Sequence, residues 1–275
     1  MKSPAKINWN LRIVGRRPDG YHLIDSIFVP IYDLYDEVNL QLELGRPLNL
    51  EVSGPFLDRI PHDETNLAFK ALKSLGSFLK LELGGVLTID KHIPVAAGLG
   101  GGSSNAATVL LLGRKLLLDH HIHISDEQLH QIALSLGADV PFFLKPQVAQ
   151  VQGIGEKISI SQFKPKGVLV LITPDFPISA QSAYTLFSKS NRNYSHPSNS
   201  IDPTNDLGDV LKEKYVALGV LLNTLKVQGA VHALISGSGP TCIGMFNDIE
   251  AAEVALRHIS MELNTHNYNF FLTNL

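Results

Sequence analysis

The sequence predicts an α+β fold with two lobes rather than a regular βαβ winding. The first observation behind this prediction is that strand-like segments followed by helix-like segments occur twice along the 275 residues. The second is that 44% of the residues are apolar and 18% are charged, which is ordinary for a globular protein with a substantial core. We place the boundary near residue 150, which gives one domain over 1–150 and a second over 151–275.

Strands open the first lobe. Residues 6–14, "KINWNLRIV", alternate between apolar and polar side chains, which predicts a half-buried strand with a polar face. The apolar face carries Ile7, Trp9, Leu11 and Ile13, and the polar face carries Lys6, Asn8, Asn10 and Arg12. Three further strands are predicted from "LIDSIFVPI" (23–31), "EVNLQLEL" (37–44) and "LNLEVS" (48–53).

Helices then cover this lobe. Thr65 is the expected cap of a helix that continues to about residue 81 with apolar residues at helical spacing. A strand over 86–94 leads into a glycine-rich turn and a helix from about 103 to 118. The next helix is signalled by a capping box of Ser125 and Gln128, with Gly137 at its end.

The second lobe repeats the order. Two β-like pieces over 148–160 precede a buried strand, "KGVLVLITP", and a short helix, "SAQSAYTLF". The polar, Pro/Asn/Ser-rich stretch over 188–206 predicts a surface loop. The remaining elements expected are a helix over 207–226, a strand–turn–strand over 232–246, a helix over 248–263 and a last strand "YNFFLT".

Charge and cysteine content narrow the function classes. The net charge of −3 and the lack of a basic tract argue against a nucleic-acid partner. The single cysteine, Cys242, can form neither a disulfide framework nor a zinc site, which favours a reducing, cytoplasmic compartment and a packing role for the thiol. No apolar run approaches the roughly 20 residues of a membrane span, and the first residues lack the apolar core of a signal peptide.

The turn "GLGGGSSN" (98–105) is the strongest chemical signal. Glycines let backbone approach a ligand closely, and a helix that starts there presents unbonded N–H groups and the positive end of its dipole. This combination binds phosphate without arginines, and Ser103 and Ser104 add hydroxyls for phosphate oxygens or a magnesium ion.

Two common phosphate loops do not fit this turn. A Walker A loop requires a lysine that 98–104 lacks, and a dinucleotide fingerprint requires glycine where Ser103 stands. A tight strand-to-helix turn or a hinge without any ligand is the remaining alternative.

Three separated stretches resemble the motifs of the GHMP small-molecule kinases, in the same order and at similar spacing. They are "PAKINWNL" with "GRRPDGYH", then "PVAAGLGGGSSNAA", then "ISGSGPTCIG". The resemblance covers Pro4 to about Phe246 and is weakest over 155–230. Within the superfamily, "GRRPDGYH", "GLGGGSSNAA" and "LGADVPFF" resemble the branch whose acceptor is 4-diphosphocytidyl-2-C-methyl-D-erythritol.

The resemblance implies a fold and a reaction. The fold would be a two-lobed GHMP kinase fold, with an ATP lobe like domain 2 of ribosomal protein S5 and a ferredoxin-like C-terminal lobe. ATP would give its γ-phosphate to the 2-hydroxyl of a cytidine diphosphate-linked methylerythritol, a step of non-mevalonate isoprenoid precursor synthesis, in a cleft between the lobes. Mg²⁺ is expected with ATP, and Ser104 is the nearest candidate ligand. A monomer or homodimer is expected, and the final strand is expected to be short because relatives usually extend further.

The resemblance also implies the catalytic pair. Asp139, in "GADVP", would accept the proton of the substrate hydroxyl. Lys6 would keep Asp139 ionised and steady the transferring phosphoryl group. The alternative for Asp139 is an aspartate that only caps a helix or lies in a turn.

Ligand contacts follow in the same way. Asn8 would bond the substrate near the reacting hydroxyl, Tyr21 would stack on the cytosine, and His22 would bond its edge. Tyr184 would close the other side of the base, although a core tyrosine is the equal alternative. The residues expected to bind ATP are Asn66, Lys91, Pro94, Gly98, Leu99, Gly100, Gly101, Gly102, Ser103 and Ser104. The turn "GSGPT" (237–241) would support the cleft and the phosphate loop.

Two other functions stay open at this point. One is a GHMP-fold nucleotide-binding regulatory protein without kinase activity, and the other is a GHMP kinase for a different small alcohol. The cluster "DHHIH" (119–123) is interpreted as a solvent-exposed loop rather than a metal site, because it lies between two helices without a distant partner.

Overall fold

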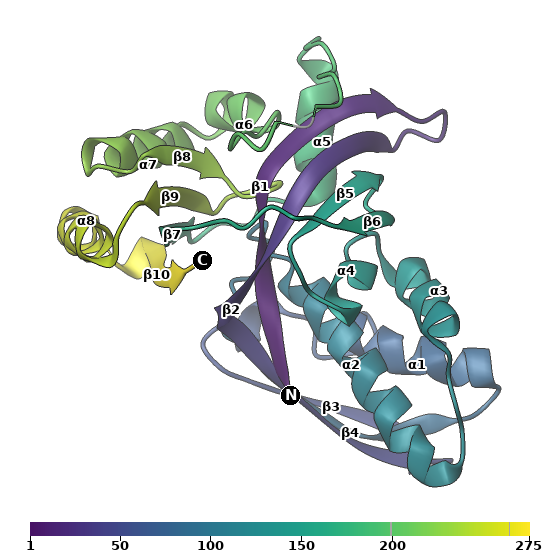
Figure 1. The fold of residues 1–275 in the computed structure, drawn as a ribbon. Helices are drawn as coiled ribbons and strands as arrows, with labels where there is room; N and C mark the ends of the chain where they lie inside the picture. The colour runs from purple at the N-terminus through teal and green to yellow at the C-terminus, as the bar shows by residue number, and fades with distance from the viewer. Residues whose placement is uncertain (199, 264) are drawn as a thin grey trace. The chain divides into compact units, whose positions relative to one another are not determined.

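The structure is a computed structural model, and it describes residues 1–198, 200–263 and 265–275 (Figure 1). The chain forms two compact units, each assembled from several segments. Unit 1 consists of Met1–Ala5, Leu34–Val95 and Gly100–Pro146, and unit 2 of Lys6–Asp33, Ala96–Leu99 and Gln147–Leu275. Strands β1 (Lys2–Arg16) and β2 (His22–Leu44) contribute residues to both units. The division of the chain into domains at residue 150 stays a prediction.

Unit 1 combines part of a six-stranded sheet with helices. Strand β4 pairs in parallel with β3 and antiparallel with the second half of β2, where Val38 faces Ile89. Helix α1 packs on β4, and α2 and α3 pack on α1 (Figure 1). The elements are β3 (Leu48–Ser53), η1 (Leu57–Arg59), α1 (Leu67–Leu79), β4 (Leu83–Asp90), α2 (Gly101–Leu117), η2 (Leu118–His120), α3 (Asp126–Leu136) and α4 (Val140–Leu144).

Unit 2 contains strands of two sheets, part of the six-stranded sheet and a separate four-stranded sheet. The first half of β2 pairs antiparallel with β5, and β5 pairs with β6. The second sheet has the order β10-β7-β9-β8. Its elements are β5 (Ala149–Gly153), β6 (Lys157–Ile160), β7 (Val168–Pro174), α5 (Ala180–Lys189), α6 (Gly208–Lys214), α7 (Val216–Val227), β8 (His232–Ile235), β9 (Cys242–Phe246), α8 (Ile249–Glu262), η3 (Thr265–Asn267) and β10 (Tyr268–Asn274).

The second sheet confirms the ferredoxin-like expectation. Along the chain, β7, helices, β8, β9, α8 and β10 give the order βαββαβ, with the last strand beside the first. All seven residues of β7 are buried, as its apolar run predicts, because helices α7 and α8 pack on this sheet (Figure 1). Cys242 lies fully buried in β9, so it packs as a small apolar side chain, as expected.

Several predicted elements need correction. The two strands expected over 23–31 and 37–44 are one continuous strand, β2. The helix expected over 207–226 is two helices, because Tyr215 leaves the helical region at φ −122°. The final strand is not short: β10 pairs with β7 over seven residues.

The cap of the first helix was also assigned one residue early. Asn66 caps α1 by accepting a hydrogen bond from Ala68 N, while Thr65 bonds to Asp63. Asparagine is preferred over threonine at an N-cap, which agrees with Asn66 rather than Thr65 as the cap. The predicted capping box of Ser125 and Gln128 is confirmed in α3.

The polar loop over 188–206 lies along β1 rather than away from the body of unit 2. Leu11 N donates to Thr204 O at 2.9 Å, and Asp206 N donates to Leu11 O at 2.9 Å. Ser195 N donates to Ile13 O at 2.8 Å. Asn199, within this predicted loop, lies outside the described residues. Backbone pairing therefore gives this stretch partners that its composition does not reveal.

Candidate active site

The polar face of β1 is buried, contrary to the half-exposed strand that its alternation predicts. Lys6 and Asn8 are 5% and 3% exposed. Lys6 Nζ donates to Asn8 Oδ1 at 2.7 Å, and Asn8 Nδ2 donates to Ser26 Oγ of β2 at 2.9 Å. The Lys6 ammonium also lies 4.3 Å from the centre of the Phe28 ring. Burial of polar groups that bond to one another is typical of a functional site rather than of a solvent face.

All three sequence motifs meet in unit 2. Lys6 N, from the first motif, donates to Leu99 O of the glycine-rich segment at 2.9 Å. Ser236 Oγ, just before "GSGPT", donates to Gly98 O at 2.9 Å. Thr241 N donates to Ala97 O at 3.3 Å. The spacing of these motifs along the chain therefore corresponds to direct contacts between them.

Two glycines make this meeting sterically possible. A Cβ on Gly98 would lie 2.1 Å from Ser236 O, and the residue has φ +76°. A Cβ on Gly237 would lie 2.7 Å from Asn8 Oδ1. Both positions exclude any side chain because protein atoms already occupy the space. Gly98 thus has a packing reason as well as its predicted place in the phosphate turn.

Gly102 differs from these two glycines. Helix α2 begins at Gly101, and its N-cap residue, Gly100, makes no side-chain capping hydrogen bond. A Cβ on Gly101 would lie 2.9 Å from Lys91 Nζ, whereas a Cβ on Gly102 would meet nothing within 4 Å. Gly102 is exposed and has no positive φ. Neither packing nor backbone strain requires a glycine there, so the backbone at this point is open to the close approach of an external group.

Asp36 is the functional-site residue that sequence reasoning missed. Its carboxylate is fully buried in β2 and accepts from His92 N at 2.7 Å and from Ile93 N at 2.8 Å. It also accepts from Asn105 Nδ2 at 2.9 Å and pairs with the Lys91 ammonium. One carboxylate therefore fixes both the segment entering the glycine turn and the helix that leaves it. The only signal was an acidic residue within a mostly apolar strand.

Lys91 forms a buried ion pair with Asp36. Its side chain is 2% exposed, and its ammonium lies under Gly101. Burial lowers the pKa of the Lys91 ammonium, although the charge of Asp36 opposes that shift. Asn66 is also engaged, as the cap of α1 and as a donor to Pro61 O at 2.8 Å. The roles of Lys91, Asn66 and the buried Pro94 toward ATP stay predictions.

The serines of the turn offer little to a metal ion. Ser104 is fully buried, and its Oγ accepts a hydrogen bond from Ser3 Oγ at 2.8 Å. Ser103 is half-buried. Among the described residues, no group of three His, Cys, Asp or Glu side chains could hold a metal. Ser104 is therefore not an accessible ligand for magnesium. In the separate cluster "DHHIH", the side chains of His120, His121 and His123 are exposed, as expected.

Asp139 lies in unit 1 at the N-cap position of α4. It is half-buried, and its side chain makes no capping hydrogen bond to that helix. Its place in the chain is thus the one that the capping alternative requires, but the carboxylate does not perform that role. The catalytic role of Asp139 stays a prediction.

Two of the predicted cytosine residues, His22 and Tyr184, form an aromatic cluster with Phe187 in unit 2. The rings of His22 and Tyr184 stack with centroids 5.1 Å apart, and Phe187 meets His22 edge-on. His22 Nε2 bonds to Ser188 Oγ at 3.0 Å, while Tyr21 is 61% exposed. Burial lowers the pKa of His22, and the charge of Arg16 lowers it further. Because the rings of His22 and Tyr184 stack on each other, a base cannot enter between them. Because Nε2 of His22 bonds to Ser188, Nδ1 is the ring nitrogen that remains to bond the edge of a cytosine.

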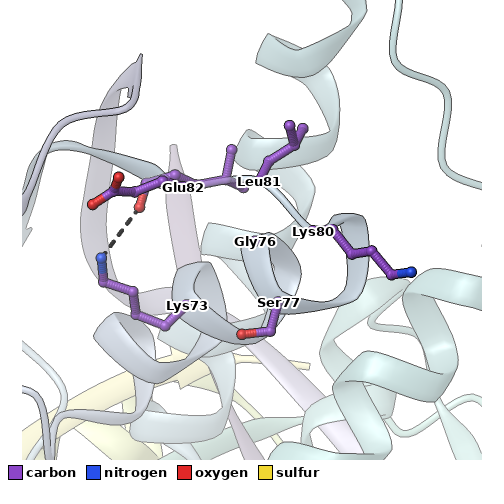
Figure 2. A pocket seen from close by; sticks show the side chains of 7 residues that line it. Lys73, Gly76, Ser77, Lys80, Leu81 and Glu82 are labelled. Carbon is purple, nitrogen blue, oxygen red and sulfur yellow. Dashed lines mark hydrogen bonds between the residues drawn. The ribbon is translucent and has the colours of Figure 1, made fainter.

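A separate pocket of about 280 Å³ lies in unit 1 at the C-terminal end of α1. Figure 2 shows that Lys73 and Lys80 point in different directions, and Lys73 Nζ donates to Leu83 O at 3.4 Å. Leu75 of α1 packs at Gly113, which is about 18 Å along α2 from its start at the helical rise per residue. The pocket therefore lies well away from the glycine turn.

The comparisons with known proteins agree with this geometry. The family model of the GHMP kinases N terminal domain matches residues 66–146, and that of the GHMP kinases C terminal matches 198–261. A Clostridium botulinum protein named 4-diphosphocytidyl-2-C-methyl-D-erythritol kinase is 37% identical over 269 residues, which covers 92% of each chain. The chain belongs to the GHMP kinase family.

Further relatives and solved structures agree with that assignment. A Geobacter metallireducens protein with the same name is 37% identical to this GHMP kinase over 273 residues, or 94% of this chain and 93% of its own. The crystal structure of a 4-(cytidine 5'-diphospho)-2C-methyl-D-erythritol kinase has a TM-score of 0.79 at 26% identity and covers 100% of this chain and 98% of its own. A mevalonate kinase from L. major has a TM-score of 0.69 at 15% identity over 99% of this chain and 95% of its own, a likeness of fold alone. None of the described helices of this GHMP kinase is both long and apolar enough to span a membrane.

We expect Gly102→Ala to weaken nucleotide binding without harming stability. The added methyl would stand where phosphate is expected to approach, so the Kd for ADP should rise about tenfold, equivalent to the loss of one hydrogen bond to a charged group. The melting temperature should stay or rise, because alanine favours a helix more than glycine does. Calorimetric titration and thermal melts would measure both effects.

Gly219→Ala is the matched control for this substitution. Gly219 lies in α7, and an added Cβ there would also meet nothing within 4 Å. It should gain helix stability and leave the Kd for ADP unchanged. Equal Kd values for wild type and Gly102→Ala would contradict a phosphate turn at this position.

We expect Asp36→Ala to lower the free energy of unfolding by about 3–5 kcal/mol, because it leaves the Lys91 charge buried and unpaired. Denaturant unfolding would measure the loss. Asp19→Ala, which breaks the exposed Arg17–Asp19 pair, should cost less than about 1 kcal/mol. A similar small loss for both variants would show that the buried network does not hold the turn.

We expect His22 to make stability depend on pH. The pKa of His22 is lowered in the folded protein, so the unfolded chain binds more protons as pH falls below about 6.5. The free energy of unfolding should therefore fall with decreasing pH through the lowered pKa of His22. The fall should be shallower in His22→Gln, and parallel curves for the two proteins between pH 7.5 and 5 would show that His22 is not the cause.

Proposed function

We propose that the chain transfers the γ-phosphate of ATP to the 2-hydroxyl of 4-diphosphocytidyl-2-C-methyl-D-erythritol, in the non-mevalonate route to isoprenoid precursors. The observation that carries this proposal is the 37% identity, over 92% of both chains, to a relative with that kinase name. The hydrogen bonds of Lys6 N to Leu99 O and of Ser236 Oγ to Gly98 O support it, because they join the three motifs that carry the family resemblance.

The proposed phosphate site is the start of α2. Phosphoryl transfer requires positioning and charge stabilisation more than covalent chemistry from the protein. The ATP phosphates would be positioned and stabilised by the backbone amides of Gly101 and Gly102, by the helix dipole and by the Ser103 hydroxyl. Leu99 and Gly100 would shape the approach. Magnesium enters, in this proposal, as part of the MgATP substrate, since the described residues offer no cage for it.

Lys6 and Asp139 are proposed as the catalytic groups. Asp139 would accept the proton of the acceptor hydroxyl. Lys6 would supply positive charge to the transferring phosphoryl group and favour the ionised form of Asp139. Asn8, which holds the Lys6 ammonium, would use its remaining amide hydrogen on the acceptor.

The acceptor's cytosine is proposed to be recognised by the aromatic cluster. Tyr21 is exposed and can stack on a base, while His22 is fixed by Ser188 and Tyr184 so that its Nδ1 edge can bond to the ring. Tyr184 would cover the opposite side of the base. We propose residues 1–150 as the ATP-binding domain and residues 151–275 as the C-terminal domain. Asn8, Tyr21 and His22 would bind the acceptor from the first and Tyr184 from the second.

We further propose that the protein works in the cytoplasm, as a monomer or homodimer. The single cysteine supports a reducing compartment, because a buried thiol in β9 serves packing and nothing in the sequence builds a disulfide.

We expect Asp139→Asn to lower kcat for phosphorylation of the cytidyl acceptor by about 10²–10⁴-fold, the usual worth of a positioned base. The Kd for ADP should stay within about twofold of wild type, because the substitution keeps the shape of the side chain. ADP release in a coupled assay, with phosphorus NMR of the product, would measure the reaction.

Acceptor choice separates the proposed function from its alternatives. The cytidyl alcohol should be phosphorylated, and mevalonate and homoserine should not. Turnover with another alcohol alone would keep the kinase class and overturn the acceptor. Nucleotide binding without turnover, unaffected by Asp139→Asn, would instead identify a regulatory protein.

A further inference from the structure

We propose that Ser26 is a positioning residue that sets the orientation of the Asn8 amide and, through it, the position of the Lys6 ammonium. This inference rests on the proposed function, in which Lys6 and Asn8 act on the reacting groups. Ser26 itself is 1% exposed, lies in β2 and is expected to touch neither substrate.

The direction of hydrogen bonding at Ser26 follows from its single proton. Its Oγ donates to the carbonyl oxygen of Asn10 in β1, and a carbonyl can only accept. Once that proton is used, Oγ can take part in other bonds only as an acceptor. Ile27 N donates to Asn10 Oδ1 at 2.7 Å, so Asn10, which accepts the hydrogen bond of Ser26, is itself held in place.

The orientation of Asn8 follows next. An asparagine amide can be turned by 180°, and its two ends differ only in donor and acceptor character. Because Ser26 Oγ can only accept, Asn8 must present its NH₂ group there, and it does so at 2.9 Å. The reversed amide would place oxygen against oxygen at Ser26 and NH₂ against the Lys6 ammonium. Ser26 therefore excludes one of the two orientations.

Lys6 is placed as a result. With the Asn8 amide fixed, Oδ1 faces the Lys6 ammonium and accepts its hydrogen bond at 2.7 Å. The Phe28 ring confines the same ammonium at 4.3 Å. Gly237 keeps room for this arrangement, since a Cβ there would lie 2.7 Å from Asn8 Oδ1. Ser26 of strand β2 and Gly237 thus both act on the Asn8 side chain, and the Asn8 side chain in turn positions the Lys6 ammonium.

Ser26 also decides what Asn8 presents to a ligand. One hydrogen of Asn8 Nδ2 is used by Ser26, and the other remains for an oxygen of the acceptor or of the transferring phosphoryl group. In the reversed orientation Asn8 would offer a carbonyl oxygen instead, which would repel phosphate oxygens. The hydroxyl of Ser26 therefore matters although it is buried behind the reacting groups.

The test compares Ser26→Ala with Ser26→Thr. Alanine removes the hydroxyl, and threonine keeps it. We expect kcat to fall about tenfold in Ser26→Ala, the scale of one lost hydrogen bond, with the Kd for ADP within about twofold of wild type. Ser26→Thr should recover most of kcat. Thr273→Val, which removes another buried hydroxyl, one bonded to Asp33, should leave kcat unchanged.

A double-mutant cycle separates positioning from a merely structural effect. If Ser26 acts through Lys6, then Ser26→Ala should add little to the loss already caused by Lys6→Met. An equal further loss in the Lys6→Met background would overturn the inference. If Ser26→Ala does not fold, Ser26→Cys, which keeps the volume but donates weakly, takes its place in the cycle with the same expectation.

A readout without turnover distinguishes failure of this inference from failure of the proposed function. The side-chain NH₂ of Asn8 should exchange slowly with solvent in wild type and in Ser26→Thr, and faster in Ser26→Ala, by NMR. Unchanged exchange in Ser26→Ala would refute the positioning role whatever the substrate is. Absence of cytidyl phosphorylation in wild type, with the exchange pattern as expected, would refute the proposed acceptor and leave the positioning of Lys6 intact.

Discussion

The approach of two glycine turns, at Gly98 and at Ser236–Gly237, is the contact on which the arrangement within unit 2 depends. Ser236 Oγ bonds to Gly98 O, and neither Gly98 nor Gly237 could carry a side chain without displacing backbone or Asn8. The first strand is joined to the same place by the Lys6 N–Leu99 O bond. Interactions between backbones are less tolerant of shifts than side-chain packing, because no rotamer can absorb a displacement. The backbone of Lys6 is therefore held by a segment, Gly98–Leu99, that is itself held by Ser236.

Two buried lysines, Lys6 and Lys91, belong to different networks. Lys91 is paired with the buried carboxylate of Asp36, which ties the entry and the exit of the phosphate turn together. Removing either partner of such a buried pair leaves an uncompensated charge, so the pair serves the stability of the turn. Lys6 donates to the amide oxygen of Asn8 and lies against the Phe28 ring, which connects it to strand β2.

Much of the fold could be predicted because periodicity reports local burial. The run in β7 and the capping box at Ser125 followed from local patterns, whereas the ferredoxin-like order of the second sheet followed from the family resemblance. The motifs at Lys6, Gly98 and Ser236 could be found, but the reasons for individual glycines could not, since they depend on atoms far away in the chain. Asp36 went unnoticed for the same reason: its donors come from 91–93 and 105. The buried polar face of β1 was missed because alternation predicts which residues share a face but not what covers that face.

The division of β1 and β2 between both units bears on how the chain is made. The first half of β2 pairs with β5, with Ile24 opposite Gly153, and the last strand, β10, completes the sheet that β7 begins. On the ribosome, residues emerging early must therefore wait for partners that are synthesised much later, and a chain of such long-range pairings closes slowly. The residues of nascent β2 that later pair with β5 would keep an unpaired edge throughout that interval, and such an edge is open to pairing with other chains.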